Sequence, residues 1–255
     1  MSKRYIRYAA VDAGKSTAPL PVAHNCGERG LAVLLFTAAH DARAGACQIG
    51  SRLGLVRPAA TFGTDTEFNR AWLQSLAGRP VACVLVDEAR FLTVAPVRQL
   101  HRMAHIEDVP VICWGLRSDC QGEAFAGSAM LLTLADGVEE MKSICACVQK
   151  ATMNIRIDAE GHRVQQGEQV VIGGNGRYCA VCPACFDSDK DAGAVAPGLF
   201  GCSPGAWPSG RLTDWRAGGL AVQQFSRCNS SALAALDPPR AGPGRKGAEA
   251  RCGSA

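Results

Sequence analysis

Eight residues near the N-terminus have the types and spacing of a phosphate-binding loop. They follow the pattern G-x-x-x-x-G-K-[ST], except that alanine stands at the first glycine: Ala9, Ala10, Val11, Asp12, Ala13, Gly14, Lys15 and Ser16. In such a loop, successive backbone N–H groups surround an anion, and the helix that follows adds the positive end of its dipole. Lys15 is expected to reach the β- and γ-phosphates of a nucleotide, and the Ser16 hydroxyl is expected to bind Mg²⁺.

An acidic pair, Asp87 and Glu88, directly follows the apolar run 81–86. This is the Walker B arrangement, and ligands of open α/β sheets bind beyond the carboxyl ends of the strands. Asp87 is therefore expected to hold Mg²⁺, directly or through water. Glu88 can take a proton from an attacking hydroxyl. The intact strand and its distance from Lys15 along the chain favour this interpretation over a solvated strand end.

Four of the 13 cysteines form two close pairs, Cys145 with Cys147 and Cys182 with Cys185. Four thiolates suit a tetrahedral structural zinc ion, and a small module with little core needs such a support. Cys179 is a competing ligand, and a set of reduced thiols without metal is the alternative. Because four protein ligands leave no open position, the zinc is expected to be structural rather than catalytic.

The elements that must position these residues alternate between short apolar runs and helical stretches, which predicts an α/β fold with a parallel sheet. The predicted strands cover residues 5–8, 31–36, 81–86 and 109–114. A crossover helix is predicted over 93–105, with Val94, Val97, Leu100 and Met103 on one face.

The helix after the phosphate loop should begin near Lys15, but Pro19 and Pro21 require it to be distorted or to begin later. Composition then divides the chain into a P-loop domain (1–140), a zinc-binding β-module (141–187) and a tail (188–255). In the module, 151–157 and 169–172 are predicted to be short antiparallel strands. The tail is rich in Gly, Ala, Pro and Ser and is expected to be disordered.

The formal net charge of +4 is not gathered into long basic runs. A nucleotide suffices as the anionic partner, and no nucleic acid polymer is expected. No run approaches the roughly 18 apolar residues of a membrane span, and no apolar segment follows the basic N-terminus. We expect a cytoplasmic protein without a membrane partner.

Taken together, these motifs resemble thymidine kinase of the bacterial and human cytosolic type. The resemblance covers residues 3–186 and follows the order of the chain: AGKS (13–16), ERGLAVLLFT (28–37), HDAR (40–43), SRLGL (51–55), VDEA (86–89), GLRSD (115–119), QGE (121–123), KATM (150–153) and VIGGNGRY (171–178). It implies a RecA-like P-loop domain, a zinc-anchored lasso over the substrate and a homotetramer. The implied reaction moves the γ-phosphoryl group of ATP to the 5′-hydroxyl of deoxythymidine, which gives dTMP and ADP.

The resemblance also implies roles for individual residues. Lys15 and the loop amides would bind the phosphates, Ser16 and Asp87 would serve Mg²⁺, and Glu88 would be the general base. Ala89 and Arg90 would complete the nucleotide side. The substrate side would consist of Arg43, Cys120, Val171, Ile172, Gly173, Gly174 and Tyr178.

Three residues depart from the family pattern. Arg90 stands where the family has Gln, and Cys120 stands where it has a Phe that packs on the base. Trp114 replaces a Tyr and is expected to refill part of that space. A relative that binds nucleotide without efficient turnover is therefore an alternative. A motor or recombination ATPase is a third possibility, which the 171–178 segment and the cysteine pairs disfavour.

Overall fold

The structure is a computed structural model that describes residues 2–41, 45–158, 161–165, 167 and 178–188. Its centre is a six-stranded, wholly parallel sheet with the strand order β5-β2-β6-β7-β1-β8. The strands are β1 (Arg4–Tyr8), β2 (Val33–Ala38), β5 (Ala60–Phe62), β6 (Cys83–Val86), β7 (Val111–Gly115) and β8 (Gly137–Glu140). The four strands predicted from apolar runs are confirmed as β1, β2, β6 and β7, and the predicted α/β class is confirmed with them.

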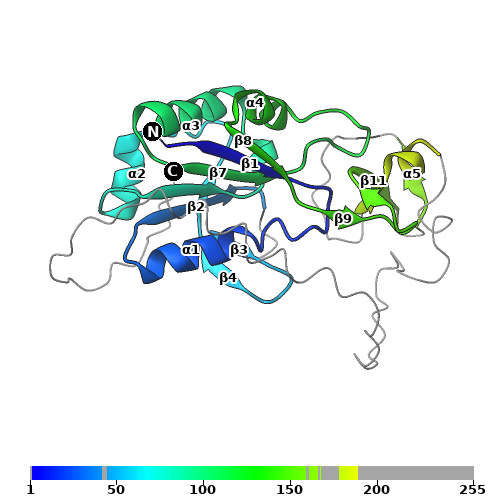
Figure 1. Ribbon diagram of the computed structural model, residues 1–255, viewed down its shortest axis with the longest axis horizontal. Helices are drawn as coiled ribbons and strands as arrows, with labels where there is room; N and C mark the ends of the chain where they lie inside the picture. Colours follow the sequence, from blue (N-terminus) through cyan, green and yellow to red (C-terminus); the bar gives the residue numbers. More distant parts are fainter. Residues whose placement is uncertain (1, 42–44, 159–160, 166, 168–177, 189–255) are drawn as a thin grey trace. The chain divides into compact units, whose positions relative to one another are not determined.

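Helices cover both faces of this sheet (Figure 1). On one face, α2 (Arg70–Ala77), α3 (Val94–Ile106) and α4 (Ala126–Leu134) enclose the larger core, which includes Phe36 and Val84. On the other face, α1 (Pro19–Glu28) packs Leu20 and Ala23 against the sheet. Helix α3 confirms the predicted crossover helix, but Val94 is 39% exposed, so the predicted apolar face begins one turn later.

The start of α1 resolves the difficulty raised by the two prolines. The chain makes turns from Val11 to Ala18, and α1 begins only at Pro19. Pro19 and Pro21 therefore occupy the first and third helical positions. The first four N–H groups of a helix have no partner within the helix, so the missing donors cost nothing there. The expectation of a helix start near Lys15 is wrong, and the later start is the correct alternative.

Beyond residue 140 the chain forms a small module, here called the cysteine module (residues 141–188). Strand β11 (Met153–Ile157) pairs antiparallel with β12 (Arg163–Val164) and with β13 (Tyr178–Val181). Strands β9 (Ser143–Ile144) and β10 (Lys150–Ala151) form a second antiparallel pair, and α5 spans Pro183–Asp187. The predicted strand over 169–172 lies outside the described residues, as does the predicted tail from residue 189 onward.

Two short elements complete the described part of the chain. A hairpin pairs β3 (Gln48–Gly50) with β4 (Val56–Pro58), and the 3-10 helix η1 (Ala89–Phe91) follows β6. Among the described residues, no helix has both the length and the apolar character needed to cross a bilayer.

Candidate active site and metal centre

Three loops with chemically useful residues leave the same edge of the sheet. Strand β7 lies between β6 and β1, and all three run parallel. One edge of the sheet therefore carries the phosphate loop (9–16), the acidic pair (87–88) and the 116–120 segment, each of which follows the carboxyl end of one of these strands. A backbone hydrogen bond of 3.3 Å from Ala9 N–H to the Gly115 carbonyl joins two of these loops. This edge is where an open α/β sheet binds its ligands.

Alanine at the first position of the loop is compatible with its backbone. Ala9 is buried, and its backbone φ is not positive. The left-handed conformations fall instead on Asp12, with φ of 63°, and on Gly14, with φ of 74°. Asp tolerates this region better than most residues, and Gly adopts it freely. The glycine pattern of the loop therefore requires Gly14 but not a glycine at residue 9.

Lys15 is folded into the phosphate loop. Its ammonium group donates a hydrogen bond of 2.6 Å to the Ala10 carbonyl, and the side chain is buried. Burial lowers the pKa of Lys15 to about 8, against the opposing effect of the Glu88 carboxylate. A buried ammonium group gains much from an anionic ligand.

The two residues predicted to serve Mg²⁺ are in contact. The Ser16 hydroxyl hydrogen-bonds with the Asp87 carboxylate, and Asp87 is only 3% exposed. Burial, together with the nearby Glu88 carboxylate, raises the pKa of Asp87 to about 7. Oxygen donors of this kind are the ligands that Mg²⁺ prefers, and a divalent ion would relieve the crowding of the two carboxylates.

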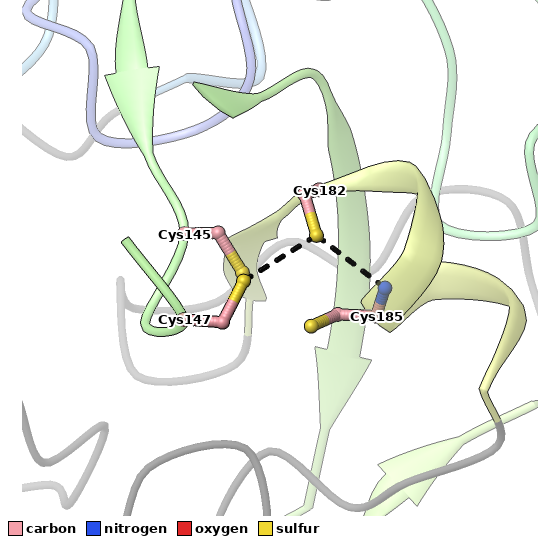
Figure 2. A group of neighbouring side chains, drawn as sticks. All are labelled: Cys145, Cys147, Cys182 and Cys185. Atoms are coloured by element: carbon pink, nitrogen blue, oxygen red, sulfur yellow. Dashed lines mark hydrogen bonds between the residues drawn. The ribbon is translucent and has the colours of Figure 1, made fainter. Parts of the chain in front are cut away.

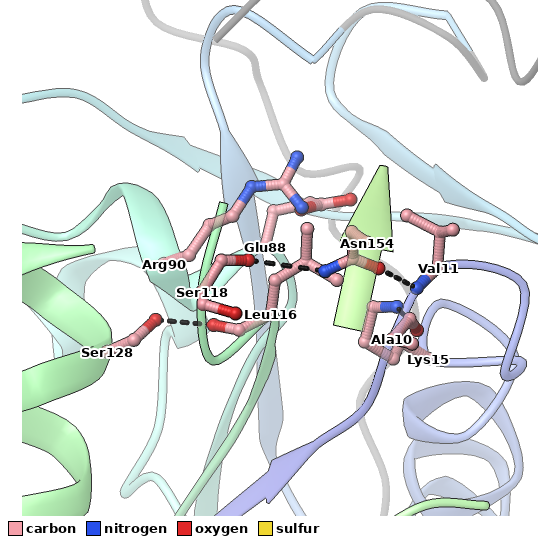
Figure 3. Close-up of polar contacts among 9 residues, drawn as sticks. All are labelled: Ala10, Val11, Lys15, Glu88, Arg90, Leu116, Ser118, Ser128 and Asn154. Carbon is pink, nitrogen blue, oxygen red and sulfur yellow. Dashed lines mark hydrogen bonds and ion pairs between the residues drawn. The ribbon is translucent and has the colours of Figure 1, made fainter. Parts of the chain in front are cut away.

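Glu88 is in contact with Arg90, one of the three residues that depart from the family pattern. Glu88 has a left-handed backbone, with φ of 53°. Its Oε2 lies 3.1 Å from Arg90 Nη1, and both side chains are largely buried (Figure 3). The Arg90 guanidinium also stacks over Phe91, with 4.4 Å between Cζ and the ring centroid. Glu88, the candidate base, is therefore ion-paired with Arg90, whose guanidinium in turn stacks on the Phe91 ring.

Two residues named from the sequence have no surface for a ligand. Ala89 is fully buried in the core shared with α3. Trp114 is fully buried with Leu20 and Ala23 on the α1 face of the sheet. The expectation that Trp114 refills space at the base is therefore wrong, because alternate residues of a strand point to opposite faces and this one points into the α1 core.

The predicted substrate residues are only partly described. Arg43 and the segment from Val171 to Gly174 lie outside the described residues. Tyr178 begins β13 and pairs in register with Arg156 of β11. Cys120 is buried within a turn in which Asp119 accepts hydrogen bonds from the backbone N–H groups of Gln121 and Glu123, and burial raises the pKa of the Cys120 thiol.

The four predicted zinc ligands come together in the cysteine module (Figure 2). The Sγ atoms of Cys145, Cys147, Cys182 and Cys185 all lie within 4.8 Å of one another. Cys147 Sγ is 3.5 Å from Cys182 Sγ. Zn–S bonds of about 2.3 Å place tetrahedral sulfur ligands about 3.8 Å apart. The donor set and its spacing therefore fit zinc, and Cys179 is not among the four.

Local backbone structure explains how each pair presents its sulfurs. Cys145 closes the tight turn between β9 and β10, in which its N–H and carbonyl bond to Gln149 and Val148. Cys182 caps α5, and its Sγ accepts from the Cys185 N–H at 3.4 Å. This hydrogen bond is the largest cause that lowers the pKa of Cys182 to about 7, whereas burial raises the pKa of Cys185. A low thiol pKa favours the thiolate that a metal binds, so this argument applies to Cys182 and not to Cys185.

Sequence reasoning missed Asn154, which connects the cysteine module to the phosphate loop. Its side chain is 2% exposed, and its Oδ1 accepts a hydrogen bond of 2.8 Å from Val11 N–H. One signal was available. Asn154 interrupts an apolar strand between Met153 and Ile155, and a buried amide requires hydrogen-bond partners.

Comparisons with known proteins agree with this arrangement. The family model described as thymidine kinase matches residues 3–186. The chain is similar to the thymidine kinase of Albidiferax ferrireducens, with 56% identity over 190 residues that cover 74% of this chain and 94% of that protein. It is 51% identical to the thymidine kinase of Chromobacterium violaceum over 189 residues, which cover 74% of this chain and all of that protein. For the thymidine kinase of Salmonella typhimurium the identity is 43% over 195 residues, with 76% and 95% covered.

Proposed function

The chain belongs to the thymidine kinase family of phosphotransferases, and we propose that it transfers the γ-phosphoryl group of ATP to the 5′-hydroxyl of deoxythymidine. The products are dTMP and ADP, and the role is salvage of a DNA precursor. The observation that carries this proposal is the meeting of Lys15, Ser16, Asp87 and Glu88 at one edge of a parallel sheet.

In the proposed reaction, the 5′-oxygen of deoxythymidine forms a bond to the γ-phosphorus. The bond from that phosphorus to the β–γ bridging oxygen breaks, and its electrons leave with ADP. Glu88 accepts the proton of the attacking hydroxyl. Lys15 and the N–H groups of the phosphate loop offset the charge of the β- and γ-phosphates. Arg43 is proposed to lie beside the 5′ end, and Val171 to Gly174 with Tyr178 to hold the base.

The proposal includes two metal ions with different roles. Ser16 and Asp87 would hold Mg²⁺, which neutralises phosphate charge when it is bound. Cys145, Cys147, Cys182 and Cys185 would hold zinc, which stabilises the fold of the cysteine module. The oxygen and sulfur donor sets match the preferences of the two ions.

A product assay tests the proposed function. The full chain is incubated with Mg²⁺, ATP labelled at the γ-phosphate and deoxythymidine, and the label is followed into dTMP. Deoxycytidine and deoxyadenosine serve as control acceptors. Transfer to deoxythymidine is expected, and an absence of labelled dTMP would contradict the proposal.

The ion pair between Arg90 and Glu88 favours one alternative, a relative that binds nucleotide without efficient turnover. The pair occupies the carboxylate that the reaction needs as a base. Nucleotide binding that raises the thermal midpoint, with no product formed, would identify this alternative. DNA-stimulated ATP hydrolysis would instead point to a motor or recombination ATPase.

The proposal includes a homotetramer that acts in the cytoplasm. Light scattering on the full chain measures the assembly, for which a mass of four chains is expected. A monomeric mass would remove the homotetramer from the proposal without affecting the proposed reaction.

A further inference from the structure

The side chain of Asn154 connects three separate parts of the chain. It belongs to β11 of the cysteine module, yet its Oδ1 accepts from Val11 N–H of the phosphate loop. Its Nδ2 donates a hydrogen bond of 3.2 Å to the Ser118 carbonyl, in the segment that follows β7 (Figure 3). Both polar atoms of this buried amide thus form hydrogen bonds to other parts of the chain rather than within β11.

The hydrogen bond to Val11 acts at a sensitive place in the loop. Val11 immediately precedes Asp12, which has the left-handed backbone that the loop requires. A non-glycine residue keeps such a conformation only where its surroundings hold it. Arg52 forms an ion pair with Asp12, but both side chains are exposed, and exposed ion pairs contribute little. The part-buried hydrogen bond to the buried Asn154 side chain is therefore the stronger restraint on this part of the loop.

A second contact supports the same junction. The Arg117 guanidinium donates a hydrogen bond of 3.5 Å to the Thr152 carbonyl, two residues before Asn154. Arg117 also lies over the ring of Tyr8, the last residue of β1, with 5.7 Å between Cζ and the ring centroid. Arg117, which follows β7, thus connects the residue that precedes β11 with the end of β1.

We propose that Asn154 is a positioning residue for nucleotide binding. Its amide holds the Val11 N–H group and, with it, the left-handed turn at Asp12, so the phosphate loop is ordered before the nucleotide arrives. The cysteine module thereby raises nucleotide affinity through the backbone of Val11. This inference rests on the proposed ATP site, and it assigns no chemical step to Asn154.

Titration calorimetry with MgADP on the full chain tests the role of Asn154 without any turnover. We expect Asn154→Ala to raise the Kd for MgADP about tenfold, which corresponds to a loss of about 1.4 kcal/mol of binding free energy. This value lies in the upper part of the range for one hydrogen bond. Hydrogen exchange gives a second readout, because the Val11 amide should exchange faster in the variant. If Asn154→Ala fails to fold, Asn154→Ser, whose short side chain cannot span both partners, takes its place.

Ile155→Val is the matched control, because Ile155 is the next residue of β11 and packs in the core of the cysteine module. It should lower the thermal midpoint and leave both the Kd for MgADP and Val11 exchange unchanged. An unchanged Kd in the Asn154 variant, or an equal loss in the control, would overturn the inference. Failure of the wild-type chain to form dTMP, with MgADP affinity still dependent on Asn154, would instead contradict only the proposed function.

Discussion

The sheet domain (residues 2–140) and the cysteine module hold their important side chains by different means. In the sheet domain, a core of 18 buried residues supports parallel strands, and the phosphate loop and acidic pair simply follow strand ends. Among the described residues of the cysteine module the buried cluster has seven members, and two of them, Cys145 and Cys182, are candidate metal ligands. Apolar burial is enough to position the candidate active site of the sheet domain. The candidate metal site must itself stabilise the cysteine module in which it lies.

The largest effect, on turnover, is expected at Glu88, the candidate catalytic base of the sheet domain. Glu88→Gln keeps the size of the side chain but removes the proton acceptor, so kcat should fall by about 10²- to 10⁴-fold. The affinity for MgADP should stay close to that of the wild type. Steady-state kinetics and calorimetry measure the two quantities, with the exposed Glu67→Gln as the control. Unchanged turnover would exclude Glu88 as the base.

Loss of the metal should affect the cysteine module more than the sheet domain. In Cys182→Ser, elemental analysis should show a fall from about one zinc ion per chain to none. Proteolysis should then cut within residues 141–188 before it cuts the sheet domain. Cys26→Ala, which changes a buried free cysteine of α1, is expected to keep its zinc. A zinc-free wild type purified without chelator would contradict the assignment.

A smaller effect is expected from the ion pair at the edge of the sheet. Arg90→Gln removes the contact with Glu88 and the stacking on Phe91, and it leaves a buried carboxylate without its cation, so the free energy of unfolding should fall by about 1–3 kcal/mol. Arg90→Lys keeps the charge but loses the planar stacking, and it should recover only part of the loss. Urea denaturation measures both variants. A more stable Arg90→Gln protein would show that the buried ion pair destabilises the folded state.

Acid should weaken the sheet domain through His101 of α3. Burial, together with the nearby Arg4 guanidinium and the ring of His105, lowers the pKa of His101, against the effect of Asp136. The folded state therefore binds this proton less readily than the unfolded state. The stability from neutral His101 is complete above about pH 6.5 and declines as the pH falls through the lower folded pKa. Urea denaturation at pH 8 and pH 5 should show a smaller decline in His101→Gln than in the wild type.

The smallest effect is expected from the end of the chain. The thymidine kinase of Chromobacterium violaceum aligns over its full length with 74% of this chain, so residues beyond the aligned part have no counterpart in it. Removal of residues 190–255 should leave kcat and KM unchanged. A large loss of activity on truncation would show that this segment takes part in the site.

Local sequence patterns predicted the parallel sheet, the helix α3 and the group of four cysteines that could hold a metal. These features depend on apolar runs, on 3.6-residue periodicity and on ligand spacing, all of which are visible over short stretches. The assignment of Trp114 to the base failed for a different reason. A strand pattern does not say which face of the sheet a fully buried residue will occupy when both faces are covered.

The sequence alone determined the candidate site residues Lys15, Ser16, Asp87 and Glu88, because residue type and spacing are sufficient to predict a phosphate loop and a Walker B pair. Only the tertiary structure decided how these groups are restrained. The contacts from Asn154 to Val11 and from Arg90 to Glu88 depend on side-chain direction. The first joins residues 143 positions apart, and the packing of strands and loops, rather than any local pattern, brings such partners within hydrogen-bonding distance.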